Sequence, residues 1–105
     1  MDRRQLACHP GRLGDLVKAV VDVERMLIAI GGALHADEEA ALLQDGSQQV
    51  DLWGINLYPE NTGPDFVEFD SLINIRPAQG NRSRFVEDGF LRQRIVLVLE
   101  ELLPD

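Results

Sequence analysis

Two apolar runs on either side of a turn most limit what this chain can fold into. The runs are residues 52–58 and 66–75, and the segment 59–65 between them holds two prolines, an asparagine and a glycine. Pro, Asn and Gly between strand-like runs are typical of a hairpin loop, and neither proline interrupts a run. The sequence therefore predicts a β-hairpin at the centre of the chain.

Side chains alternate along a strand, so the predicted hairpin has two distinct faces. With Tyr58 opposite Phe66, the apolar face holds Trp53, Ile55, Leu57, Val67, Phe69, Ser71, Ile73 and Ile75. The other face is mixed and holds Asn56, Tyr58, Glu68, Asp70, Asn74 and Arg76, together with Leu52 and Leu72. This contrast fixes the pairing register and predicts that Trp53 is buried.

The segment before this hairpin, residues 16–32, is rich in valine and isoleucine, which favour strands. Residues 17–23 and 26–30 are expected to form a second hairpin, although the turn between them lacks the Gly or Asn of a tight turn. The apolar residues of this segment also roughly follow helical spacing, so a helix is the alternative.

Two helices are expected, over residues 36–44 and from Asp88, as N-cap, to Leu103. Residues 1–12 contain Pro10 and Gly11 and indicate an irregular arm or a short helix. The chain of 105 residues is then a single domain. Its predicted class is α+β: a two-layer sandwich on an antiparallel sheet built from two β-hairpins, with two or three helices.

The last helix is apolar nearly all round, which is hard to bury in a domain this small. We therefore expect a homodimer that forms through the helix Leu91–Leu103 or through the sheet edge near it.

The net charge of −8 argues against non-specific binding of nucleic acid, because phosphates repel an acidic body. The sequence shows neither an apolar run long enough to span a bilayer nor a secretory signal, so we expect a cytoplasmic protein without a membrane partner. A single cysteine, Cys8, is compatible with a reducing compartment. It is interpreted as an incidental thiol.

Lysine and arginine are absent from positions 26–75, and five arginines then follow within residues 76–94. Amides, a hydroxyl and guanidiniums on a loop stiffened by Pro77 suit an anion, either a small molecule or an acidic segment of a partner. The candidate ligand-binding residues are Arg76, Gln79, Asn81, Arg82, Ser83, Asn56 and Asn74. The alternative is that these arginines pair internally, for example Arg76 with Asp70 or Glu68.

A second candidate site has an imidazole and carboxylates, the groups that hold divalent metals or transfer protons. Its residues are His35, Asp37 and Asp51, and it would make the protein a metal-dependent or acid–base hydrolase. A structural or protein-interaction module without a ligand is the third hypothesis. The sequence contains no phosphate-loop, dinucleotide or nucleophile-elbow motif, so no cofactor is indicated.

Several phrases resemble a family of short microbial proteins known only as a domain of unknown function. They are Val-Val-Asp-Val-Glu at 20–24, Leu-His-Ala-Asp at 34–37, Asp-Leu-Trp-Gly at 51–54, Leu-Ile-Asn-Ile-Arg-Pro at 72–77 and Gly-Asn-Arg-Ser at 80–83. The resemblance covers about residues 17–103 and implies one compact domain, but it implies no activity. It supports one polar group formed by His35, Asp37, Asp51, Asn56, Asn74, Arg76, Asn81 and Arg82.

Overall fold

The computed structural model describes residues 16–61 and 63–103 of the chain. The expectations for residues 1–12 and for Cys8 lie outside the described residues. The strands are β1 (Val17–Asp22), β2 (Leu27–Ile30), β3 (Leu52–Leu57) and β4 (Val67–Glu68). The α-helices are α2 (His35–Gln44) and α3 (Gly89–Leu102), and short 3₁₀ turns cover Gln49–Asp51, Gly63–Phe66, Leu72–Asn74 and Pro77–Gln79.

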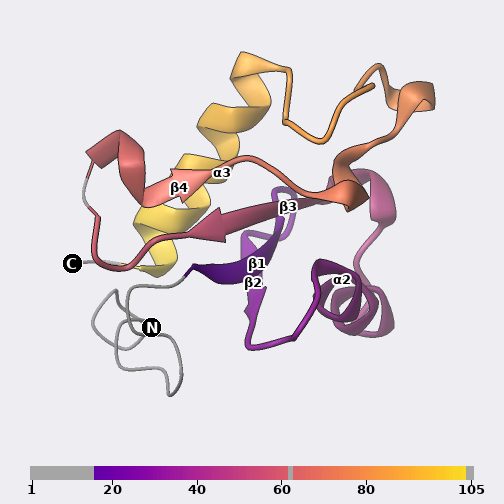
Figure 1. Cartoon of the computed structure of the whole chain (residues 1–105). Helices are drawn as coiled ribbons and strands as arrows, with labels where there is room; N and C mark the ends of the chain where they lie inside the picture. Colours follow the sequence, from indigo (N-terminus) through magenta and orange to yellow (C-terminus); the bar gives the residue numbers. More distant parts are fainter. Residues whose placement is uncertain (1–15, 62, 104–105) are drawn as a thin grey trace.

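The four strands form one antiparallel sheet in the order β2-β1-β3-β4 (Figure 1). It is built from two hairpins, and each hairpin contributes one central and one edge strand. With two helices packed on this sheet, the α+β fold predicted from the sequence is confirmed. No helix among the described residues is long and apolar enough to cross a membrane.

The first hairpin is confirmed over the helical alternative, and a buried aspartate accounts for its unusual turn. The Asp22 carboxylate accepts hydrogen bonds from the backbone N–H groups of Glu24 and Arg25, at 2.9 and 2.8 Å. Its second oxygen accepts one from the Ser47 hydroxyl at 2.6 Å. Aspartate stabilises turns in this way, so the turn forms without the expected Gly or Asn. Met26 there adopts a positive φ of 57°.

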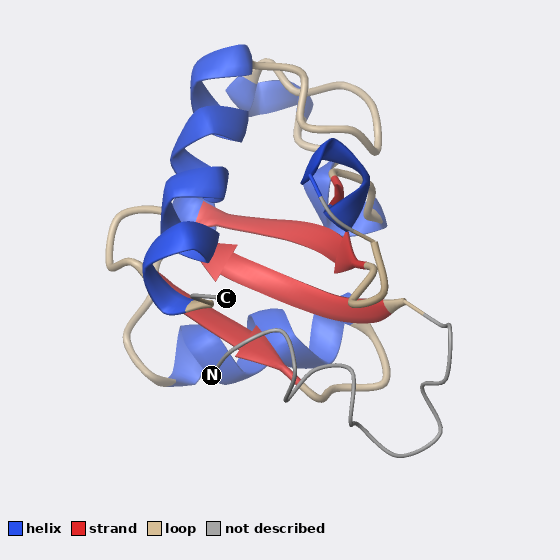
Figure 2. Cartoon of the chain, turned by 90° about the vertical axis from the view of Figure 1, so that its left-hand side faces the viewer, coloured by secondary structure: helices blue, strands red, loops and turns tan. Residues whose placement is uncertain are grey.

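The two faces of the sheet carry separate apolar clusters. One cluster joins the odd-numbered residues of β1 and β3 to α3, and it includes Val21, Trp53, Ile55, Ile95 and Val98. The other joins Val20 and Leu52 to Leu42 of α2. Because neighbouring residues of a strand point to opposite faces, α3 and α2 cover opposite sides of the sheet. Figure 2 shows α3 running across the strands.

The central hairpin has the predicted register, with Asn56 opposite Glu68 and Leu57 opposite Val67. Trp53 is buried as expected, at 4% exposure. The second strand is much shorter than predicted, however, because β4 ends at Glu68 rather than Ile75. Ile75 lies 42% exposed and not on the core face.

The Asn74 side chain takes the place of the missing strand. Its Oδ1 accepts a hydrogen bond from the N–H of Gly54 at 2.8 Å, and its Nδ2 donates to the Gly54 carbonyl at 3.0 Å. Ser71 packs over Gly54: a Cβ atom on Gly54 would lie 2.6 Å from the Ser71 Cβ. Only glycine therefore fits at position 54.

Candidate functional site

The loop that follows Asn74 is held together by its own polar groups. Asn81 is 4% exposed, and its Nδ2 donates to the carbonyls of Asn74, Ser83 and Phe85 at 2.8, 3.1 and 2.7 Å. Its Oδ1 accepts from the N–H of Glu87 at 2.9 Å. The Asn74 and Asn81 amides, both candidate ligand-binding groups, thus stabilise the loop.

Arg76 is also buried, at 9% exposure, and it donates mainly to backbone carbonyls. Its guanidinium reaches the carbonyls of Ile73 at 3.1 Å, of Gln49 at 2.7 Å and of Leu52. It also pairs with the Glu39 carboxylate at 3.4 Å and lies 4.6 Å from the centre of the Trp53 ring. Arg76 therefore pairs internally, as the sequence alternative proposed, but not with Asp70 or Glu68.

The remaining loop candidates lie at the surface or beside a cavity. Arg82 is exposed and Ser83 half-buried, and their backbone N–H groups both donate to the Glu87 carboxylate, at 3.0 and 2.8 Å. A hydrogen bond from the Ser83 side chain lowers the pKa of Glu87 most, and the bonds from the Arg82 and Ser83 N–H groups lower it further. Gln79 donates to the Val50 carbonyl at 3.3 Å.

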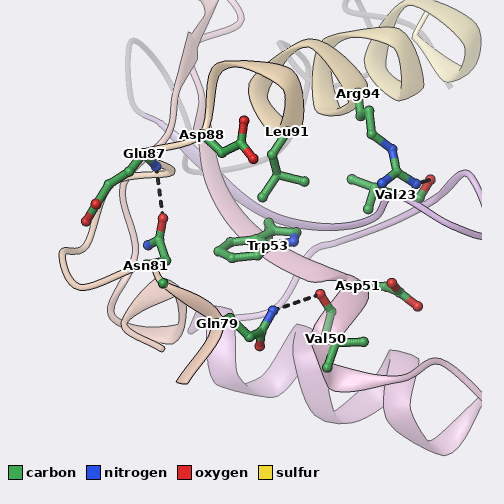
Figure 3. A pocket seen from close by; sticks show the side chains of 11 residues that line it. Val23, Val50, Asp51, Trp53, Gln79, Asn81, Glu87, Asp88, Leu91 and Arg94 are labelled. Atoms are coloured by element: carbon green, nitrogen blue, oxygen red, sulfur yellow. Dashed lines mark hydrogen bonds between the residues drawn. The ribbon is translucent and has the colours of Figure 1, made fainter. Parts of the chain in front are cut away.

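A cavity of about 430 Å³ lies beside Trp53 and is lined by Gln79, Asn81 and Asp51, among others. Figure 3 shows Glu87 and Asp51 on opposite sides of Trp53, with carboxylates that point away from its ring. The Gln79 and Asn81 amides are already bonded to the protein. These four polar side chains therefore do not converge on one ligand position, although the cavity is the larger of the two that hold candidate residues.

The proposed metal set is not brought together. Asp51 lies at the Trp53 cavity, whereas His35 lies at the start of α2 beside another cleft. Within residues 16–61 and 63–103, no group of three or more His, Cys, Asp or Glu side chains could hold a metal ion. Burial raises the pKa of Asp51, and Asp22 and Glu24 add to this shift.

The second cleft, which we name the His35 cleft, has a volume of about 230 Å³ and collects polar side chains from four parts of the chain. Its residues are Lys18 of β1, Leu34, His35 and Ala36 at the start of α2, Asn56 of β3, and Asp70, Ser71, Leu72, Ile73 and Arg84 from the segment after β4. Lys18 and Asn56 are cross-strand partners, so their side chains share one face of the sheet.

Asn56 is the most constrained residue of the His35 cleft, at 6% exposure. Its Nδ2 donates to the Glu68 carboxylate at 2.9 Å and to the Asp70 carbonyl at 3.2 Å. Two acceptors on this side fix the orientation of the amide. Among the described residues, the Oδ1 atom has no hydrogen-bond partner. A buried acceptor without a protein donor is rare and costly in folded proteins.

His35 presents a second acceptor. Its Nε2 lies 2.7 Å from the carbonyl of Ile55, so Nε2 carries the hydrogen and Nδ1 keeps a lone pair in the neutral ring. Burial lowers the pKa of His35 below its ordinary value of 6.5. Lys18 and Arg84 also lower it, whereas the Ile55 carbonyl and Asp70 oppose the shift. The imidazole is therefore mainly neutral at pH 7.

Two cations line the same cleft. Arg84 pairs with Asp70 at 2.9 Å and keeps about half of its side chain exposed, at 54%. Lys18 is half-buried and is the only lysine of the chain. Neither residue was among the candidates from the sequence. The sequence did contain a signal for Lys18, which is a single lysine within a valine-rich strand. A charged side chain on a buried sheet must reach a polar opening, so its position indicates a cleft.

The pKa of His35 predicts how stability depends on pH. As the pH falls through about 6.5, the unfolded chain takes up a proton that the folded ring resists, so stability falls until the pH reaches the lowered pKa of the folded ring. Glutamine in His35→Gln still donates to the Ile55 carbonyl but does not titrate. We expect the melting temperature of this variant to fall less over the same range. Equal slopes for the two proteins would contradict the assignment, since His9 is common to both.

Comparison with known proteins places the chain in a family but gives no activity. The search of curated proteins and the search of solved structures returned no match. A family model described as "Protein of unknown function (DUF5674)" matches residues 1–102, nearly the whole chain. The resemblance seen in the sequence is thereby confirmed, and the chain belongs to this family of proteins of unknown function.

Proposed function

We propose that the protein binds a small organic anion in the His35 cleft, and that this ligand also donates a hydrogen bond. The observation that carries the proposal is the buried Oδ1 of Asn56, which has no partner among the described residues. The proposed ligand is still an anion, as expected from the sequence. Its proposed binding position is now the His35 cleft and not the loop of residues 76–83.

The charges at the cleft support an anion. Lys18 and Arg84 carry two positive charges, and Asp70 offsets one of them. Because the His35 ring is mainly neutral, it does not oppose or reinforce this balance. Arg84 already pairs with Asp70, an acid that lines the cleft. The ligand's carboxylate or phosphate would therefore lie against the ammonium group of Lys18.

The acceptors at the cleft define the rest of the ligand. Asn56 Oδ1 lacks a donor and His35 Nδ1 is a second acceptor, whereas an anion alone has no donor to offer. A hydroxyl or amine on the ligand supplies it. A volume of about 230 Å³ is below the range usual for drug-sized ligands, so a compact molecule such as a 2-hydroxy acid fits this description.

Lysine 18 provides a direct test, because it is the only lysine. Reductive ¹³C-methylation of the amines keeps the positive charge and gives one side-chain NMR signal. We expect glycolate and lactate to shift the Lys18 signal with saturable affinity. Acetate and propionate, which lack the hydroxyl, should bind about tenfold more weakly, because one hydrogen bond to a buried acceptor is worth about 1.5 kcal/mol.

Two variants separate a specific site from surface charge. Lys18→Met should abolish glycolate binding, measured by calorimetry on the unmethylated protein, whereas Lys18→Arg should retain most of it. The control is Arg25→Met, which removes a cation that pairs with Asp45 instead. No response of the Lys18 signal to the hydroxy acids, to inorganic phosphate or to glycerol phosphate would overturn the proposal. Equal affinity for acetate and glycolate would overturn the role of Asn56.

A further inference from the structure

The outward side of α3 carries large apolar side chains that are exposed. Phe90 is 79% exposed and Leu97 is 57% exposed, although Ile95 and Val98 of the same helix are fully buried. Beside them is a mainly apolar groove of about 560 Å³, lined by Phe69, Gly89, Arg92, Gln93, Val96 and Leu97. Exposed apolar surface of this kind marks an interaction site.

The charges along this side of α3 indicate what covers it. Arg94 and Glu101 are two helical turns apart and lie on the same flank of the helix, three residues before Leu97 and four after it. Glu101 lies in the last turn of α3, where a negative charge is unfavourable for the helix dipole, and Arg94 is the sixth of its fourteen residues, beyond the first turn. Neither charge is therefore placed to stabilise its own helix through the dipole.

We infer that two copies of the chain associate through α3, with the helices antiparallel and a two-fold axis beside Leu97. In this arrangement Leu97 meets Leu97 of the second copy, and Arg94 of each copy lies next to Glu101 of the other. In this antiparallel arrangement the two helix dipoles point in opposite directions, so they attract each other. A two-fold interface repeats every contact, so the charge pair forms twice.

The present contacts of Arg94 leave it available for this role. Its guanidinium reaches the Glu24 carboxylate and the Val23 carbonyl, both at 3.3 Å. The side chains of Arg94 and Glu24 are 50% and 69% exposed, and pairs this exposed contribute little to stability. The interface is also independent of the proposed ligand site, since α3 and the His35 cleft lie on opposite faces of the sheet.

The oligomeric state provides the first test. Sedimentation over a wide dilution series should show a species of twice the 11.7 kDa chain mass that dissociates on dilution. Leu97→Asp should abolish it. The matched control is Leu43→Asp on α2, which changes a leucine that is 40% exposed on the opposite face and should leave the dimer intact. A chain that stays monomeric at the highest concentration overturns the proposal.

Charge reversal tests the antiparallel geometry itself. Arg94→Glu and Glu101→Arg each place two like charges at the interface, and each should weaken self-association at least about tenfold. Mixed together, the two variants should form a heterodimer of near-native affinity, because both cross-contacts then pair opposite charges. Failure of the mixture to associate would exclude this arrangement, since the contacts that Arg94→Glu loses within its own chain are the exposed pair with Glu24 and the bond to the Val23 carbonyl.

Discussion

Replacing Arg76 by methionine is expected to lower the free energy of unfolding by about 3–5 kcal/mol, the largest effect of any single arginine. The side chain supplies donors to three backbone carbonyls and to Glu39, all at a position that is 9% exposed. Methionine fills similar space but leaves these acceptors without a donor. It also removes the cation that lies over Trp53.

Chemical denaturation followed by Trp53 fluorescence measures this loss, because the only tryptophan is the residue under Arg76. Arg76→Lys should recover little, since one ammonium cannot span carbonyls on three sides. Arg82→Met is the control: this arginine is exposed six residues further on, and its loss should cost under about 0.5 kcal/mol. An Arg76→Met protein within about 1 kcal/mol of the natural one would contradict the assigned role.

Asn74→Asp should be nearly as damaging, and its cost should grow with pH. The new carboxylate keeps the bond from the Gly54 N–H, but its other oxygen faces the carbonyls of Gly54 and Arg84, to which Nδ2 now donates at 3.0 Å each. Repulsion and full burial raise the pKa of this carboxyl above about 3.9, the unfolded value. Below that pH both states are protonated and the penalty is smallest.

Above that pH the unfolded chain ionises first, so stability falls as the pH rises through the window between the two pKa values. We expect a loss of about 3 kcal/mol or more at pH 7, and a smaller loss at about pH 4. Urea denaturation at both values measures the difference. Asn61→Asp is the matched control, because the Asn61 amide is exposed and, within the part of the chain that the structure describes, donates only to the Asp65 carbonyl. A pH-independent loss at position 74 would show that its amide does not replace a strand.

Residue patterns were sufficient to predict the strands and helices in which apolar side chains recur at a regular spacing. The alternation around Trp53 predicts the register of β3 against β4, and the Asp88 cap and apolar spacing predict α3, where Asp88 accepts from the Phe90 N–H at 2.8 Å. They failed at residues 69–75. There the alternation continues in the sequence, but one asparagine side chain satisfies Gly54 and frees the backbone to turn away.

The candidate site was harder to predict because the decisive partners are backbone atoms. Arginines near carboxylates suggest ion pairs, and Arg84 with Asp70 is one. Arg76 instead binds carbonyls, which every residue carries and which no sequence pattern distinguishes. Lys18 and Asn56 are 38 positions apart in the chain, and only the pairing of β1 with β3 brings them together.

The amide that replaces a strand at Gly54 also affects how copies of this protein can aggregate. An incoming strand needs a row of unpaired N–H and C=O groups, and Asn74 occupies that row at Gly54 without offering another behind it. The β3 backbone at Gly54 is thus closed to strand addition beyond the short β4, whereas β2 is the edge strand at the other end of the described sheet. Fibril growth from a destabilised chain should therefore begin at Leu27–Ile30, where a single lysine or proline would suppress it.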